Sequence, residues 1–111
     1  MSESKFYGML GLARRSGNII IGFDRVVDAV RCGLAYVVLV SADCSANTKK
    51  RVEDKCRSYG ADLITFGTSA KLGGAIGFDN AAVLAVTDNN FAVAIKNIYN
   101  NLTEVAENGS C

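Results

Sequence analysis

Two patterns of apolar residues alternate along this chain and divide it into elements of secondary structure. In one pattern, apolar residues recur at the spacing of one face of a helix, with charged residues on the opposite face. The apolar residues are Phe23, Val26, Val27, Val30 and Leu34. Residues 35–40 form an unbroken, β-branched apolar run, which is typical of a strand covered on both faces. Gly33 lies between them and supplies the left-handed conformation that ends many helices. The unit formed by residues 22–45 therefore predicts a sheet with helices on both faces.

The same patterns predict the remaining elements. Helices are expected at residues 4–15, after an N-cap at Ser45 or Asn47, at residues 70–76 after a cap at Ser69, and after Asn89 or Asn90. Strands are expected at residues 18–21, 61–66 and 81–86. In the second of these helices Val52, Cys56 and Tyr59 should face inward. This alternation predicts one α/β domain over residues 1–111, a three-layer α/β/α sandwich around a mixed sheet of about four strands.

Adjacent glycines interrupt the short helix at residues 70–76. Gly73 and Gly74 weaken a helix, so they indicate that another backbone segment passes close by. Gly77 and the residues that follow it should form a turn in which Phe78 is exposed. The sequence therefore predicts a closely packed loop before the last strand.

Composition indicates a cytoplasmic protein. No apolar run approaches the ~20 residues needed to cross a bilayer, and residues 1–15 lack a signal-peptide core. The four cysteines are scattered without a C-x-x-C pair, so free thiols are expected. We expect a monomer with no membrane partner.

The chain lacks the residues on which most catalysis depends. It contains no histidine, which removes the usual general base and the commonest metal ligand. We therefore expect no catalytic residue, cofactor or metal site. One enzyme-like alternative is a receiver-type domain with Asp43 as phosphoacceptor. Such a site needs further acidic residues after the first strand and a lysine after a later one, and neither follows the strands at residues 18–21 and 81–86.

Charge is distributed unevenly although the formal net charge is only +1. Residues 1–57 hold ten of the twelve Lys and Arg residues but six of the eleven acidic ones. A basic half can steer a domain towards a polyanion such as RNA. The alternative is that these charges lie on solvated helix faces.

Several motifs together resemble a family of ribosomal proteins that bind kink-turn RNA, known for its L-seven-Ae and L-thirty-e members. The match covers nearly the whole chain and is closest to the short bacterial paralogues. Its motifs are Gly-Leu-Ala-Arg-Arg-Ser-Gly at residues 11–17, residues 22–43 with Arg-Cys-Gly-Leu-Ala, Ser-Ala-Asn-Thr-Lys-Lys at residues 45–50, and Leu-Gly-Gly-Ala-Ile-Gly at residues 72–77.

The resemblance implies an α/β/α sandwich that binds structured RNA, ribosomal RNA included, through one edge. In the family, the first turn of the second helix enters the groove at sheared G·A pairs, and a loop before the last strand covers an extruded nucleotide. Helix N-termini favour phosphates, and RNA is read at unstacked sites. The residues implied as RNA-binding are Arg14, Arg15, Gly22, Phe23, Asp24, Arg25, Asn47, Lys49, Lys50, Ile76, Gly77, Phe78, Asp79 and Asn80.

The first turn of the second helix, which we call the reading turn, departs from the family pattern at residues 22–28. Kink-turn binders have Gly-x-Asn-Glu-x-x-Lys, whereas this chain has Asp24, Arg25 and Asp28 at the last three specified positions. Asp24 can accept hydrogen bonds from guanine amino groups, and Arg25 can contact phosphate or a guanine edge. Asp28 repels phosphate and is expected to pair with Arg25 or Arg31. A second hypothesis follows, in which the domain has lost RNA recognition and binds proteins.

Overall fold

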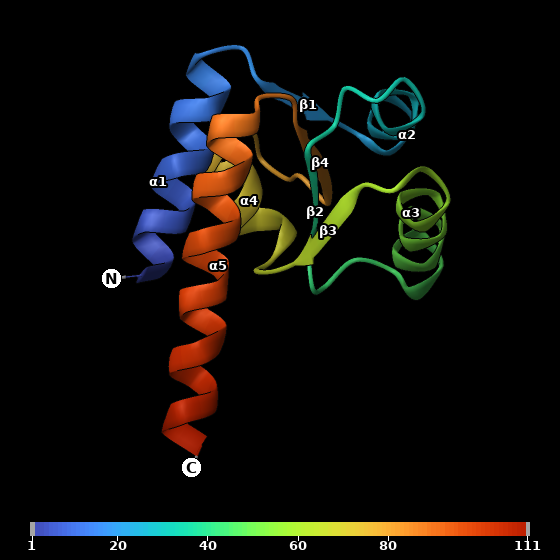
Figure 1. Cartoon of the computed structure of the whole chain (residues 1–111). Helices are drawn as coiled ribbons and strands as arrows, with labels where there is room; N and C mark the ends of the chain where they lie inside the picture. Colours follow the sequence, from blue (N-terminus) through green and yellow to red (C-terminus); the bar gives the residue numbers. More distant parts are fainter. Residues whose placement is uncertain (1, 111) are drawn as a thin grey trace.

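The computed structural model describes residues 2–110, and side chains are described for residues 3–102. Within this range helices and strands alternate as predicted, beginning and ending with a helix (Figure 1). The helices are α1 (Ser2–Arg15), α2 (Phe23–Arg31), α3 (Ala46–Tyr59), α4 (Ser69–Ile76) and α5 (Asn89–Ser110). The strands are β1 (Ile19–Ile21), β2 (Val37–Val40), β3 (Asp62–Thr65) and β4 (Val83–Val86). Each strand is one or two residues shorter than the range predicted for it.

The four strands form one mixed sheet in the order β1-β4-β2-β3. Strands β2 and β3 are parallel, while β4 lies antiparallel to both β1 and β2. In the register, Ala85 of β4 is opposite Ile20 on one side and Val38 on the other. The predicted mixed sheet is thus confirmed. A receiver-type domain has a doubly wound parallel sheet, so the antiparallel β4 contradicts that alternative.

Helices cover both faces of the sheet, which confirms the three-layer sandwich. In Figure 1, α1 and α5 lie side by side on one face of the sheet, with α2 and α3 on the other. Alternate residues of β2 point to opposite layers, as the pleat requires. Val37 and Leu39 pack in the cluster that contains α1, α4 and α5 residues, whereas Val38 and Val40 pack with α2 and α3. Both β2 and β4 are buried along their whole length.

Three large apolar or aromatic residues that the sequence patterns place in the core are exposed in the structure. Gly33, which follows the C-cap residue Cys32 of α2, adopts φ 73°, and the N–H of Leu34 donates to the Ala29 carbonyl at 2.9 Å. This left-handed turn takes Leu34 off the helix face and leaves it exposed. Tyr36, before the first residue of β2, and Tyr59, the last residue of α3, are also exposed. The expectation that Leu34 and Tyr59 face inward is therefore wrong.

The helix starts follow the rules of capping, although not always at the predicted residue. The Ser45 hydroxyl accepts the N–H of Thr48 at 3.1 Å, which confirms that cap. Thr68, and not Ser69, caps α4 by accepting the N–H of Lys71. At the start of α5 it is Asp88, and not Asn89 or Asn90, that accepts the N–H of Phe91. The predicted caps at Ser69 and Asn89 or Asn90 are one or two residues too late, since the side chain that reaches the first turn comes from the residue before the helix.

One of the two adjacent glycines in α4 holds a loop in place. A Cβ atom on Gly73 would lie 2.8 Å from the backbone of Asn80, closer than real Cβ contacts allow. The N–H of Phe78 donates to the carbonyl of Gly73 at 2.8 Å. The predicted close approach is confirmed at Gly73, whereas Gly74 has nothing within 4 Å of the corresponding position. The loop after α4 therefore folds back tightly along its own helix.

Candidate nucleic-acid interface

Three of the segments implied as RNA-binding meet where β1, β2 and β3 end and β4 begins. The N–H of Gly22, after β1, donates to the carbonyl of Val83 at 3.0 Å. The N–H of Ser41, after β2, donates to the carbonyl of Ala82 at 2.9 Å. These bonds bring the start of α2, the end of the α4–β4 loop and the β2–α3 connection to one edge of the sheet. We call it the loop edge.

The first turn of α2 offers unpaired backbone donors at the loop edge. Gly22 adopts φ 102°, which favours glycine, and no side chain caps the helix. The intrahelical ladder starts only with the N–H of Val26, which donates to the Gly22 carbonyl. The side chains of Asp24 and Arg25, which begin the reading turn, are both exposed. This turn thus presents N–H groups, a carboxylate and a guanidinium together.

Phe23, the first residue of α2, is held by an arginine from α3. The guanidinium carbon of Arg51 lies 4.5 Å from the centre of the Phe23 ring, well within the range of a cation–π contact. The ring is partly buried and packs against the core cluster between α2, α3 and the sheet. Arg51 is absent from the predicted set because this contact joins two helices whose packing cannot be read from the sequence. Its position beside Lys49 and Lys50 is the one sequence signal that points to it.

The α4–β4 loop lies against the end of α1. The side chains of Arg14 and Arg15 line a pocket of about 240 Å³ together with Ile76 and Gly77. The guanidinium carbon of Arg14 is 5.5 Å from the centre of the Phe78 ring. Phe78 remains exposed, as predicted, and so do Gly77, Asp79 and Asn80, whereas Ile76 is buried. The structure therefore joins the basic end of α1 to an exposed aromatic ring.

A third segment connects the start of α3 to the start of α4. The carboxylate of Asp43 accepts the backbone N–H of Ser69 at 3.0 Å, and that hydrogen bond is the largest cause of a lowered pKa for Asp43. The N–H of Ala42 donates to the Gly67 carbonyl at 2.8 Å. In the turn that follows, Asn47 and Lys50 are exposed and Lys49 is partly buried. Asp43 thus links the β2–α3 loop to the start of α4.

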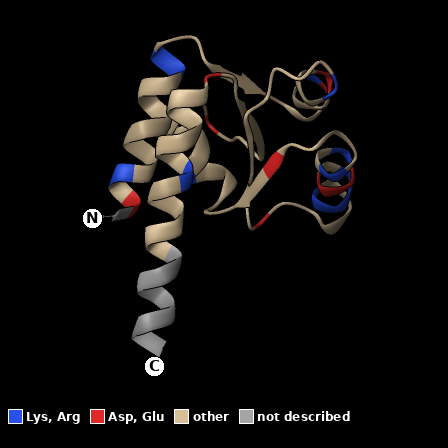
Figure 2. Cartoon of the chain, viewed as in Figure 1, with Lys and Arg blue, Asp and Glu red and all other residues tan. Residues whose placement is uncertain are grey.

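Most cations of the described residues, including those implied as RNA-binding, have no acidic partner within 4.0 Å. Among the side chains that are described, ion pairs join Arg31 to Asp28 at 3.6 Å, Arg57 to Asp54 at 3.9 Å and Lys96 to Asp62 at 2.7 Å. In the same part of the chain, no carboxylate lies within 4.0 Å of the residues Arg14, Arg15, Arg25, Lys49, Lys50 or Arg51. In Figure 2 the ribbon of α3 has blue Lys and Arg segments alternating with red acidic ones, and a blue segment marks the end of α1.

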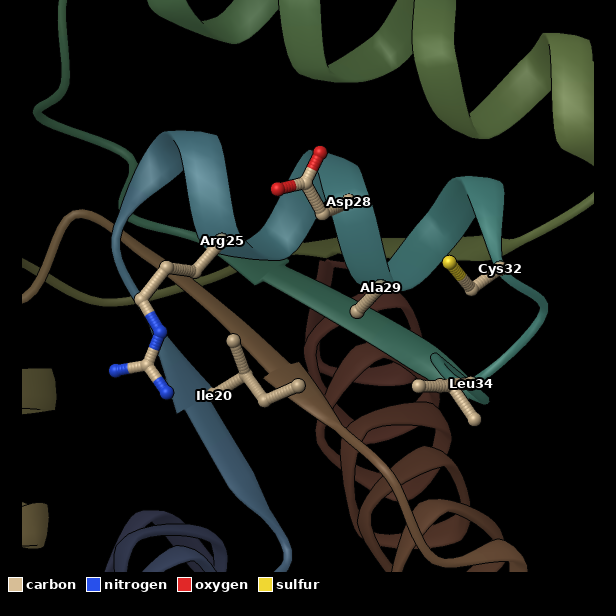
Figure 3. Close-up of a pocket in the computed structure, with 6 residues that line it drawn as sticks. All are labelled: Ile20, Arg25, Asp28, Ala29, Cys32 and Leu34. Carbon is tan, nitrogen blue, oxygen red and sulfur yellow. The ribbon is translucent and has the colours of Figure 1, made fainter.

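Figure 3 shows how the charges of α2 are arranged around an apolar hollow of about 220 Å³. Its lining includes Ile20 of β1, Ala29 of α2 and the exposed Leu34. Arg25 extends past Ile20 along β1, while Asp28 points away from the strand. The predicted pairing of Asp28 is therefore made with Arg31 and not with Arg25. Arg25 makes no ion pair with any described residue and is available to an external partner.

Comparison with known proteins identifies the family. Residues 4–96 match the sequence profile of the Ribosomal protein L7Ae/L30e/S12e/Gadd45 family. The chain belongs to this family. It is 39% identical over 92 residues to the RNA-binding protein YlxQ of Bacillus subtilis, an alignment that covers 83% of this chain and 92% of that protein. Over 78 residues it is 33% identical to the large ribosomal subunit protein eL30 of Methanosarcina mazei, covering 68% of this chain and 72% of that protein.

A solved structure confirms the fold of this family member. The structure of a protein with unknown function from Bacillus halodurans superposes with a TM-score of 0.83 at 35% sequence identity. The match covers 85% of this chain and 95% of that one. Membership in the family bears out the resemblance that the motifs at residues 11–17, 22–43, 45–50 and 72–77 indicate.

Within the described residues, no group of three or more His, Cys, Asp or Glu side chains could hold a metal ion. No helix among them is long and apolar enough to cross a membrane. The thiols of Cys32, Cys44 and Cys56 are free, and Cys111 lies outside the described residues.

Proposed function

We propose that this protein is a non-catalytic, cytoplasmic RNA-binding protein, acting as a monomer associated with the ribosome, that recognises structured RNA of the kink-turn kind. The proposal is supported by family membership and by two named relatives, one an RNA-binding protein and the other a ribosomal protein. The observation that carries it is the convergence of α2, the α4–β4 loop and unpaired cations at one edge of the sheet.

The first turn of α2 is the proposed base-reading element. Its free N–H groups and helix dipole favour a phosphate oxygen. The Asp24 carboxylate accepts hydrogen bonds from guanine amino groups, and the Arg25 guanidinium donates to a guanine edge or to phosphate. Gly22 lets the RNA backbone approach closely because it has no side chain.

The α4–β4 loop is the proposed site for an unstacked nucleotide. The exposed ring of Phe78 offers a surface on which a base can stack, and RNA-binding proteins commonly read splayed bases in this way. Gly77, Asp79 and Asn80 complete the loop, supported by the buried Ile76. On either side the backbone contacts are proposed to come from Arg14, Arg15, Asn47, Lys49 and Lys50.

Binding to two RNAs tests the proposal. A kink-turn oligonucleotide and a plain RNA duplex of equal length are titrated with the protein at two salt concentrations. We expect tighter binding to the kink-turn, with both affinities falling as salt rises. Undetectable binding to both RNAs would refute RNA recognition, and equal binding to both would refute kink-turn selectivity alone.

A second candidate function is favoured by the hollow beside α2. Its volume of about 220 Å³ is below the ~300–1,000 Å³ of most small-molecule pockets, and its lining is largely apolar. A single apolar side chain of a protein partner fits such a space. β1, which supplies Ile20, forms an edge of the sheet. Copurification with and without nuclease separates the functions, because partners that survive nuclease favour a protein-interaction module.

A further inference from the structure

Arg51 connects α3 to the first residue of α2 through a cation–π contact. The guanidinium carbon lies 4.5 Å from the centre of the Phe23 ring, while the Arg51 residue as a whole remains exposed. A cation–π contact uses the flat face of the guanidinium and leaves the N–H groups around its rim available to a ligand. Phe23 is itself anchored in the core cluster beneath α2 and α3. The ring therefore acts as a rigid platform for a positive charge.

The charge on this platform lacks a carboxylate partner. No acidic side chain among the described residues lies within 4.0 Å of Arg51, whereas Arg57 on the same helix lies 3.9 Å from Asp54. Lys49 and Lys50 precede Arg51, and Phe23 is followed directly by Asp24 and Arg25. An oriented but unneutralised guanidinium thus stands next to the proposed base-reading turn.

We propose that Arg51 binds a backbone phosphate of the RNA and that Phe23 positions it to do so. This inference rests on the proposed function and adds to it a phosphate contact on α3, next to Lys49 and Lys50. Phe23 then acts as the support of a phosphate contact and not as a stacking surface for a base. Phosphate oxygens match the planar, multiple donors of a guanidinium, which bind in a bidentate way.

The test compares four proteins on the same kink-turn RNA over a series of salt concentrations. They are the wild type, Arg51→Gln, Phe23→Leu and the control Arg57→Gln. Arg51→Gln should weaken binding roughly tenfold at low salt and reduce the slope of log K against log salt by about 0.7–0.9, because one phosphate contact is lost. Arg57→Gln should change neither quantity. Circular dichroism and thermal unfolding verify that each variant is folded.

Phe23→Leu removes the aromatic ring that positions Arg51 but keeps the positive charge of Arg51. Leucine retains apolar bulk but no aromatic face, so affinity should fall by a smaller factor while the slope stays within about 0.3 of the wild-type value. If the wild type binds RNA and Arg51→Gln behaves like Arg57→Gln, this inference is overturned and the proposed function stands. If the wild type binds no RNA, both are overturned. A loss with an unchanged slope in Arg51→Gln also refutes the phosphate contact.

Discussion

The guanidinium of Arg14 faces the ring of Phe78, with 5.5 Å between its central carbon and the ring centre. The two residues come from opposite parts of the chain, one in the last turn of α1 and the other in the α4–β4 loop. Their contact places a cation beside an exposed aromatic ring. A nucleotide can use both, because its phosphate pairs with a cation and its base stacks on an aromatic ring. It lies near the limit of about 6 Å for such interactions, so an incoming base can replace it.

The exposed ring of Phe78 gives the first prediction. Phe78→Ala should weaken binding of kink-turn RNA by about 1–3 kcal/mol, since base stacking on the ring is lost. Isothermal titration calorimetry measures the change. Tyr59→Ala is the matched control, because Tyr59 is a similarly exposed aromatic residue at the far end of α3. Equal affinities for the two variants would exclude stacking on Phe78.

Arg25 carries the second prediction. Arg25→Ala should cost about 1–3 kcal/mol of binding free energy and reduce discrimination between kink-turn RNAs with and without the G·A pairs, if its guanidinium reads a guanine edge. Arg31→Ala serves as the control, since Arg31 lies on the same helix and is paired with Asp28. Competition binding with both RNAs provides the measurement. An unchanged affinity would make Arg25 a bystander.

The two glycines of α4 give a prediction about stability. Gly73→Ala should destabilise the fold by about 1–3 kcal/mol, because its Cβ atom would lie 2.8 Å from the Asn80 backbone, which cannot move as a side chain does. Gly74→Ala should be neutral or stabilise by up to about 1 kcal/mol, because its position is open and alanine favours a helix. Urea unfolding measures both. A Gly73 variant as stable as the Gly74 variant would contradict the close contact.

The carboxylate of Asp43 predicts a pH dependence. The backbone N–H of Ser69 is the main cause that lowers the pKa of Asp43 below its ordinary value of 3.8 in the folded protein. A folded-state pKa below the unfolded one adds stability above the unfolded value, and that stability is lost as pH falls through the folded pKa. Asp43→Ala should therefore be less stable than the wild type at pH 7. The difference should shrink as pH drops below about 4.

Thermal unfolding from pH 7 to pH 3 checks this behaviour. Asp79→Ala is a suitable control, because Asp79 is an exposed aspartate for which no hydrogen bond or ion pair is recorded among the described residues. Its stability relative to the wild type should vary less with pH than that of Asp43→Ala. A constant difference between wild type and Asp43→Ala across this range would show that the bond to Ser69 does not favour the ionised carboxylate.

Local sequence rules predicted which helices and strands form but not every residue at which they begin or end. The helix face at Phe23, Val26 and Val30 and the buried run at residues 37–40 follow from side-chain periodicity, which is a property of neighbours in the chain. Leu34 obeys the same period and yet is exposed, because the left-handed turn at Gly33 ends the helix first. The cap predicted at Ser69 is made by Thr68, because the capping side chain comes from the residue before the helix.

The sequence by itself determined the three layers, because periodicity and glycine positions are local. Its motifs carried the resemblance to the family, and that resemblance implied the RNA-binding segments. Only the tertiary structure decided which side chains meet. It paired Arg51 with Phe23, Arg14 with Phe78 and Asp28 with Arg31. The first two pairs depend on how whole helices and loops pack across the sheet, a non-local outcome of burying two apolar clusters. β4 pairs with both β1 and β2, so the end of the α4–β4 loop lies beside the start of α2 and the β2–α3 connection.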